Sequence, residues 1–260
     1  MARPGSPDPP GRVDGLRSVL HPAGGIWPRA DDTPELIDHE VPSAERRRTL
    51  GDVSRLNALF LGRRCTLIHV KRLLARFPGE RTATVLDVGT GAADIPRALA
   101  RWARRARRRL RIVALDRDHD TLDRVARKTV AGYPEISLVR GDALALPIAP
   151  RGVDIVISAM TLHHLEPDAA VGYFRAMAAA TRVGFVVNDL ARSRRAYLLV
   201  WLVTRVLARS PISRHDGPLS VRRSYTTTEV TELCRRAGIL DVVVHRYPIW
   251  LRQCAVWGQS

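Results

Sequence analysis

Short apolar runs alternate with amphipathic stretches along the middle of the chain. Five of these runs have the length and composition of buried strands, at residues 84–88, 111–115, 136–139, 154–158 and 184–187. Between them, the spacing of apolar positions predicts helices over 92–109, 119–131 and 167–181. Apolar strands that alternate with helices form a parallel sheet covered on both faces. The pattern therefore predicts an α/β fold.

The two ends of the chain depart from this alternation. Residues 1–34 are rich in proline and glycine and show no sustained periodicity, so we expect a disordered tail there. One domain then spans 35–260 and opens with N-terminal helices within 35–79. Further elements are expected as helices at 43–59, 64–77 and 227–237 and as strands at 240–245 and 249–257.

Residues 189–224, after the fifth strand, form a segment longer than the ~2–6 residues of an ordinary connection. We expect it to contain a helix of its own and to act as a lid. Its run Tyr197–Val203 is apolar around the whole helix, which requires burial or a hydrophobic neighbour. Core packing is the favoured explanation of this run, and a lid over an apolar acceptor is the second.

Composition narrows the class of protein. A hydrophobic content of 45% excludes a wholly disordered chain. Cys65, Cys234 and Cys254 are too few and too widely spaced for a disulfide framework or a zinc ribbon, and they fit a reducing cytoplasm. We predict no metal ligands, no signal peptide and no membrane-spanning helix.

The chain carries a formal net charge of +16, and all but Lys71 and Lys128 of its 42 basic residues are arginine. Such a charge favours nucleic acid, acidic lipid or an anionic substrate as a partner, although GC-rich coding produces the same arginine bias. Residues 101–111 are especially rich in arginine. A solvated helix face is the favoured interpretation of that stretch, and contact with RNA or an anionic membrane is the minority one.

The first strand runs into a glycine turn, Gly89-Thr90-Gly91, and a helix begins just past it. Glycines let the backbone approach a ligand closely, and a helix N-terminus offers free N–H donors. Asp87 in the strand end and Asp94 in the first helical turn would repel a pyrophosphate, which disfavours NAD. A ligand with an ammonium and a sulfonium group suits both carboxylates.

Acidic residues also follow the next two strands. Asp116, beside Arg117, ends the second strand, where a carboxylate can accept hydrogen bonds from both ribose hydroxyls; a helix cap is the alternative. Asp142 follows the third strand, where it could accept from an adenine amino group while Ala143 packs on the ring. A simple turn residue is the alternative for Asp142.

Taken in order, these motifs resemble those of the class I S-adenosylmethionine-dependent methyltransferases, and most closely the small-molecule branch that includes the ubiquinone/menaquinone-biosynthesis methyltransferases. The resemblance implies an enzyme with a Rossmann-like, mostly parallel seven-stranded sheet and S-adenosyl-L-methionine as cofactor. It implies cofactor contacts from Asp87, Gly89, Thr90, Gly91, Asp116, Arg117, Asp142, Ala143 and Ser158. Two departures are Ala93, where the family often has glycine, and the stretch 181–184, which replaces a Lys-Pro-Gly-Gly turn.

The acceptor should meet the loops after the fourth and fifth strands, because open sheets bind ligands at the carboxyl ends of their strands. His163 and His164 are the candidate catalytic bases, since histidine titrates near neutrality; either could instead cap or pack the next helix. Candidate substrate-binding residues are Asn188 and Asp189 after the fifth strand and His215 and Arg223 in the lid. An ordinary strand-to-helix cap is the alternative for Asn188 and Asp189.

The leading hypothesis is methylation of a small molecule, at an aromatic or quinone-like hydroxyl or carbon, in the cytoplasm and within secondary metabolism. An RNA methyltransferase is the alternative. Against it, Ser158–Thr161 replaces the Asn/Asp-Pro-Pro-aromatic element that acts on exocyclic amines. A cofactor-binding scaffold without turnover is the third hypothesis. Peripheral membrane contact stays open, and the sequence does not determine the oligomeric state.

Overall fold

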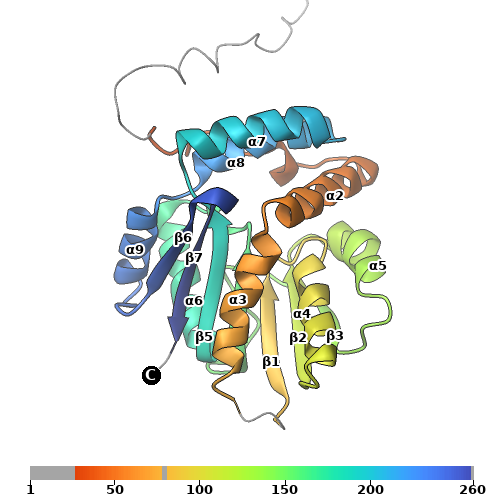
Figure 1. Ribbon diagram of the computed structural model, residues 1–260, viewed down its shortest axis with the longest axis vertical. Coiled ribbons are helices and arrows are strands. Elements are labelled where there is room, and N and C mark those ends of the chain that lie inside the picture. The colour runs from red at the N-terminus through yellow and green to blue at the C-terminus, as the bar shows by residue number, and fades with distance from the viewer. Residues whose placement is uncertain (1–26, 78–80, 259–260) are drawn as a thin grey trace, which may run out of the picture.

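The computed structural model describes residues 27–77 and 81–258 (Figure 1). Its centre is a seven-stranded sheet in the order β3-β2-β1-β4-β5-β7-β6. The strands are β1 (Ala83–Val88), β2 (Leu110–Asp116), β3 (Ile136–Arg140), β4 (Val153–Ala159), β5 (Thr181–Leu190), β6 (Val243–Tyr247) and β7 (Arg252–Gly258). β1 to β5 pair in parallel, and β7 runs antiparallel between β5 and β6. The predicted mostly parallel, seven-stranded sheet is confirmed.

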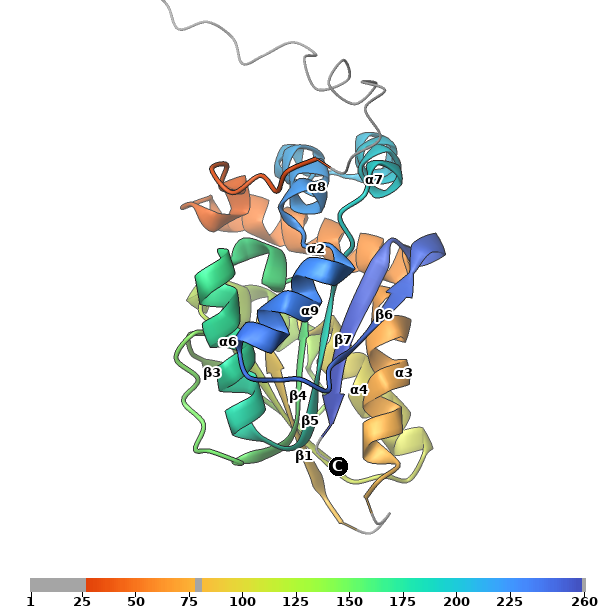
Figure 2. The ribbon, with the colours of Figure 1, turned by 90° about the vertical axis from the view of Figure 1, so that its left-hand side faces the viewer.

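Helices cover both faces of the sheet (Figures 1 and 2). One face carries α3 (Gly62–Leu74), α4 (Asp94–Arg105), η2 (Thr121–Ala126) and α5 (Arg127–Thr129), and the other carries α6 (Pro167–Ala180) and α9 (Thr227–Arg236). Val70, Leu99 and Ile112 belong to the buried cluster on the first side, and Leu86, Phe174 and Val230 to the cluster on the second. Burying each such side chain contributes about 1.5–3 kcal/mol, so the two clusters fix the sheet between its helices.

A further layer lies across the carboxyl ends of the strands (Figure 2). We call it the cap, and it comprises residues 35–59 and 194–223, with η1 (Leu36–Asp38), α2 (Ser43–Leu59), α7 (Arg194–Leu207) and α8 (Pro211–Arg223). Its two halves are joined by hydrogen bonds: Asp52 accepts from the Arg209 and Ser210 amides at 2.9 and 2.8 Å, and Asp216 accepts from the Leu36 amide at 2.9 Å. η1 and α2 therefore form one structural unit with the helices of the predicted lid, whereas α3 packs on the sheet.

The predicted lid differs from expectation in two respects. β5 continues to Leu190, and the rest of the segment holds two helices rather than one. Ser210 separates them, because its hydroxyl accepts hydrogen bonds from the amides of Ile212 and Ser213 and Pro211 occupies the first helical position. This local start signal is the physical reason for the second helix.

The described residues include part of the stretch that the sequence assigned to the N-terminal tail. Residues 27–34 fall within the stretch that the sequence led us to assign to a disordered tail, and residues 1–26 lie outside the described residues. Arg29 donates to the carbonyl oxygens of His163 at 3.0 Å and Leu165 at 2.7 Å, and its guanidinium lies 4.2 Å from the centre of the Tyr225 ring. Long-range contacts, including these of Arg29 and the hydrogen bond from Arg223 to the Thr33 carbonyl, thus position a segment that has no periodicity of its own.

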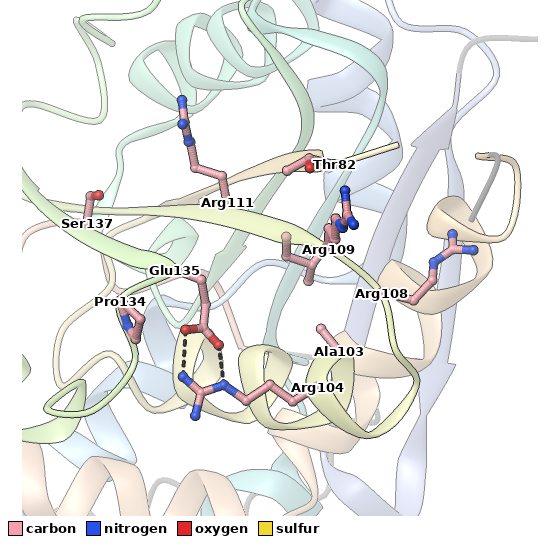
Figure 3. A pocket seen from close by; sticks show the side chains of 10 residues that line it. Thr82, Ala103, Arg104, Arg108, Arg109, Arg111, Pro134, Glu135 and Ser137 are labelled. Atoms are coloured by element: carbon pink, nitrogen blue, oxygen red, sulfur yellow. Dashed lines mark hydrogen bonds and ion pairs between the residues drawn. The ribbon is translucent and has the colours of Figure 1, made fainter. Parts of the chain in front are cut away.

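The arginine-rich stretch 101–111 is not one helix face. α4 ends at Arg105, Arg107 adopts a left-handed φ of 53°, and β2 begins at Leu110. A cavity of about 640 Å³ lies beside it, at the amino-terminal edge of the sheet (Figure 3). Among the residues that line it are Thr82, Arg104, Arg108, Arg109, Arg111, Glu135 and Ser137.

Within the described residues, no helix combines the length and the apolar character needed to span a lipid bilayer.

Candidate active site

The glycine turn after β1 has an unusual backbone. Gly89 and Gly91 have φ values of 71° and 51°, and Ala93 at the start of α4 has a φ of 54°. A Cβ atom on Gly89 would lie 2.3 Å from Thr161 Oγ1, so only glycine fits that position. Ala93, where the family often has glycine, adopts the left-handed conformation despite its methyl group.

Asp87 is buried at the end of β1, with 2% of its surface exposed. Its Oδ2 accepts a hydrogen bond from Thr90 Oγ1 at 2.6 Å. Burial raises the pKa of Asp87 to about 8; the Thr90 hydrogen bond opposes this rise, and the nearby carboxylates of Asp94 and Asp116 add to it. A cation close to this group would offset both the burial and the repulsion.

Asp116 reaches back to the glycine turn from the end of β2. Its Oδ2 accepts from the Gly91 amide at 2.8 Å, and its Oδ1 accepts from the Asp118 amide at 3.0 Å. Burial raises the pKa of Asp116 above its ordinary value, and the two amide hydrogen bonds offset only part of this rise. Arg117 points elsewhere, 3.4 Å from Asp38 in the cap.

The remaining predicted cofactor residues lie at the next strand ends. Asp142 is exposed and its Oδ1 accepts from the Leu144 amide at 2.9 Å, as a turn residue does, and Ala143 beside it is half-buried. Ser158 is buried in β4 and donates to the Val88 carbonyl at 2.8 Å. Ser158 thereby fixes β4 to the end of β1, next to the turn.

The acidic environment fits S-adenosylmethionine. Asp87, Asp94 and Asp116 gather around the glycine turn, and Asp94 Oδ2 is buried without a hydrogen-bond partner. Arg63 compensates part of this charge, 3.7 Å from Asp94. Three carboxylates favour a ligand with ammonium and sulfonium charges and would repel a diphosphate.

His163, in η3 (Leu162–His164), lies between two acidic residues. Its Nδ1 is 2.8 Å from Asp189 Oδ1, its amide donates to Asp189 Oδ2 at 3.0 Å, and its Nε2 is 3.5 Å from Glu35 Oε1. Burial raises the pKa of Asp189, but His163, the Leu190 amide and the charge of Arg252 together outweigh it, so the pKa lies below its ordinary value. An ionised Asp189 holds the ring with Nε2 facing Glu35.

His164 is arranged in the same way on the cap side. Its Nδ1 is 3.1 Å from Asp38 Oδ2, and its Nε2 is 4.0 Å from Glu35 Oε2. Burial raises the pKa of Glu35 to about 7, although the charge of His164 opposes the rise, and Glu35 Oε1 has no hydrogen-bond partner. The Glu35, His163 and His164 ligand atoms lie within 4.8 Å of one another, close enough to hold a cation.

Sequence reasoning did not find Glu35 or Asp38. Both precede the histidines by more than a hundred residues, in a stretch without periodicity or motif. No signal in the sequence relates them to the loop after β4, because only the packing of η1 under α8 brings them there.

The predicted substrate-binding residues fall into different environments. Asn188 and Asp189 lie inside β5 rather than in the loop after it. The Asn188 side-chain Nδ2 donates to the Gly62 carbonyl at 2.8 Å and to Thr66 Oγ1 at 2.9 Å. Because β5 pairs with β7 as far as Leu190, the loop starts later than expected. Asn188 therefore fastens α3 to the sheet.

The two lid residues also differ from each other. Arg223 is buried and donates to the carbonyls of both His163 and His164 at 3.3 Å, so it supports the histidine turn from behind. The His215 side chain is half-exposed on α8, with its Nδ1 2.8 Å from Asp216 Oδ1. Among the described residues, no hydrogen bond or ion pair joins His215 to either catalytic candidate.

Comparison with known proteins identifies the family. Residues 85–184 match the methyltransferase domain family. A demethylmenaquinone methyltransferase from Roseiflexus castenholzii is 32% identical over 192 residues, which are 63% of this chain and 75% of the relative. The chain belongs to the class I S-adenosylmethionine-dependent methyltransferases. S-adenosylmethionine is the cofactor of this methyltransferase, as the motifs implied.

Two further similarities are consistent with this assignment. The methyltransferase is 32% identical over 143 residues to a 2-phytyl-1,4-naphthoquinone methyltransferase from Thermosynechococcus vestitus, covering 52% of this chain and 59% of the relative. An S-adenosyl-L-methionine-dependent methyltransferase structure from Methanococcus maripaludis matches with a TM-score of 0.55 at 16% identity, over 84% of this chain and 95% of that one. The structural match supports the fold.

Proposed function

We propose that this methyltransferase transfers a methyl group to a hydroxyl or ring carbon of an aromatic, quinone-like small molecule, in the synthesis of a quinone or a secondary metabolite. Both curated relatives described above are named for naphthoquinone-type acceptors. A cytoplasmic location belongs to the proposal, and it is supported by three buried cysteines that are all free.

The observation that carries the proposal is the line Asp189–His163–Glu35. Methylation of a hydroxyl or a ring carbon releases one proton from the acceptor, so a base at the acceptor helps the reaction. Asp189 keeps His163 oriented through Nδ1, which leaves Nε2 to receive the proton. Glu35, whose Oε1 has no hydrogen-bond partner, lies 3.5 Å from Nε2, where its carboxylate would stabilise the protonated ring.

The cofactor side of the site has a separate set of residues. When bound, S-adenosylmethionine supplies a methyl group already activated on a sulfonium. Asp87 would hold its ammonium group, Asp116 its ribose hydroxyls, and Asp142 with Ala143 its adenine. The glycine turn would line the methionine part, and Ser158 keeps β4 against it. Thr90 orients the Asp87 carboxylate for this role.

The alternative of an RNA acceptor has less support. The charge of the chain suggests it, but Arg109 and Arg111 of the arginine-rich stretch line the cavity at the amino-terminal edge of the sheet (Figure 3). The histidines and the glycine turn lie at the carboxyl edge. RNA bound to those arginines would be separated from the proposed catalytic residues by the length of the strands.

A direct test compares acceptors with the purified full chain. Transfer of a labelled methyl group should occur to reduced naphthoquinones that lack a ring methyl group, and not to bulk RNA. His163→Ala should reduce turnover about 100-fold or more with little change in S-adenosylhomocysteine affinity. His119→Ala, at an exposed histidine beside Asp123, is the matched control. Methylation of RNA alone, or full turnover in His163→Ala, would overturn the proposal.

A further inference from the structure

One side of α7 is apolar and exposed. Leu198, Leu199, Leu202 and Val206 lie on it at helical spacing, with exposures between 39% and 71%. The opposite side of the helix is buried: Val200 packs in the cap cluster with Phe60 and Val221. α7 is therefore amphipathic, with its apolar stripe directed away from the protein. Figures 1 and 2 show α7 as the outermost helix of the cap, at the end of the molecule opposite the amino-terminal edge of the sheet.

Arginines border this apolar stripe at both ends. Arg195 is exposed in the first turn of α7, Arg205 is exposed near its last turn, and Arg209 follows the helix. The Arg205 guanidinium lies 5.5 Å from the centre of the Trp201 ring. A long basic side chain beside an apolar stripe, with an indole close to it, is the arrangement of helices that lie in the interface of a bilayer.

Arg209 also lines a cavity of about 310 Å³ between α2 and the end of α7. The cavity is lined by Ala44, Arg47, Arg48, Gly51, Arg55 and Arg209. Arg48 and Arg55 pair with Glu45 and Asp52, but no ion pair is found for Arg47 or Arg209 among the described residues. Four guanidinium groups, two of them uncompensated, around one hollow favour an anionic group such as a phosphate.

We propose that the apolar stripe of α7 and the arginine-lined cavity form one surface that docks on an anionic lipid bilayer. The stripe lies among the acyl chains near the head groups, and a lipid phosphate occupies the cavity. Arg209 lines the cavity and follows directly on the end of α7, which places the two parts side by side. Neither part contains a residue of the proposed catalytic or cofactor sites.

Charge decides between a bilayer and a second copy of the chain. A twofold interface would bring the same patch of both copies together, so Arg205 and Arg209 would face a second set of arginines. Like charges directly opposed in an interface are destabilising. An anionic bilayer instead supplies both an apolar layer and a negative surface.

The docked surface gives the cap a role in delivering the acceptor, a consequence that rests on the proposed function. α7 and α8 pack together, and Arg223 of α8 supports the histidine turn. A quinone-like acceptor with an apolar tail could pass from the bilayer to the site under the same cap. The docking itself does not depend on the acceptor.

The test is flotation of the full chain with vesicles of phosphatidylcholine alone or with about 30% phosphatidylglycerol, at about 50 and 300 mM salt. Binding should require phosphatidylglycerol and weaken at the higher salt. Leu202→Glu/Val206→Glu and Arg47→Glu/Arg209→Glu should each reduce the partition coefficient on the order of tenfold or more. Leu202→Trp should show a blue-shifted emission on vesicle binding, which reports insertion of the stripe.

The matched control is Arg109→Glu/Arg111→Glu, which makes the same charge change at the opposite edge of the sheet (Figure 3). It should bind vesicles within about twofold of the wild type. An equal loss in the control would mean general electrostatic attraction and would overturn the proposal. So would the absence of flotation, or dimerisation through α7 in place of vesicle binding. None of these readouts requires methyl transfer, so failure here is distinct from failure of the proposed function.

Discussion

His163 and Asp189 are joined twice: Asp189 Oδ1 lies 2.8 Å from the ring Nδ1 of His163, and Asp189 Oδ2 accepts from the His163 amide at 3.0 Å. The Asp189 carboxylate in β5 therefore fixes both the backbone and the ring orientation of His163, in the turn that follows β4. The ring can only present Nε2 to the cap, where Glu35 lies 3.5 Å away.

Replacing Asp189 should separate orientation from binding. In Asp189→Asn the amide can no longer stabilise a charged ring or hold one tautomer, so we expect turnover to fall about 100-fold or more while cofactor affinity changes little. Breaking a buried pair also costs about 3–5 kcal/mol, so unfolding must be measured alongside steady-state kinetics. Asp123→Asn, at an exposed pair with His119, is the control. Equal losses in both variants would contradict the orienting role.

The raised pKa of Asp87 predicts a pH-dependent cofactor affinity. Without ligand, this carboxyl keeps its proton up to about pH 8, and it must lose that proton to bind an ammonium group. Affinity for S-adenosylhomocysteine should therefore rise between about pH 6 and 8, by up to about tenfold per pH unit, with release of a proton. Calorimetry in two buffers of different ionisation enthalpy measures this release. Asp87→Asn should bind S-adenosylhomocysteine more weakly and release no such proton. An unchanged pH profile in the variant would show that Asp87 is not the group that titrates.

The same shift has the opposite consequence for the stability of the unliganded enzyme. The unfolded carboxyl ionises near pH 4, whereas the folded one ionises near 8. The stability contribution is therefore present below about pH 4 and is lost as the pH rises through 8. Asp87→Asn should flatten this decline in a series of urea titrations. A steeper decline in the variant would show that other groups govern it.

Arg223 and His215 should behave differently although both lie on α8. Arg223 donates to the carbonyls of His163, His164 and Thr33, so Arg223→Lys, which keeps the charge and loses the planar fork, should cost about 2–4 kcal/mol and reduce turnover. His215→Ala at the half-exposed surface should change stability by less than about 0.5 kcal/mol. Acceptor KM measured in both variants tests whether either contacts substrate. No change in either variant would mean that α8 does not close the acceptor pocket.

Gly89 should tolerate no side chain. In Gly89→Ala the added methyl group meets Thr161 and the residue must keep a φ of 71°, so we expect a loss of about 2–4 kcal/mol in the free energy of unfolding. Gly89→Ala/Thr161→Ala should recover the part due to collision and retain the part due to φ. Full recovery would show that the backbone conformation carries no cost, and no recovery would show that Thr161 is not the obstacle.

The sequence determined the features that depend on neighbouring residues. Strand β1, the glycine turn and the start of α4 are contiguous, so the apolar period and the glycines indicate them together. The order of strands and helices followed for the same reason, and with it the resemblance to the methyltransferases. Asp87 and Asp116 could be expected near one ligand, because parallel strands bring their carboxyl ends to one edge.

Tertiary structure alone decided the surroundings of the histidines. Glu35 and Asp38 come from a segment with no periodicity, and Asp189 was expected in a loop but lies within β5. Their contacts with His163 and His164 join residues that are far apart in the chain and depend on how the cap packs across the sheet. Local patterns record which face of an element is buried; they do not record which distant side chain covers it, and that is why Glu35 and Asp38 became visible as partners of the histidines only in the folded chain.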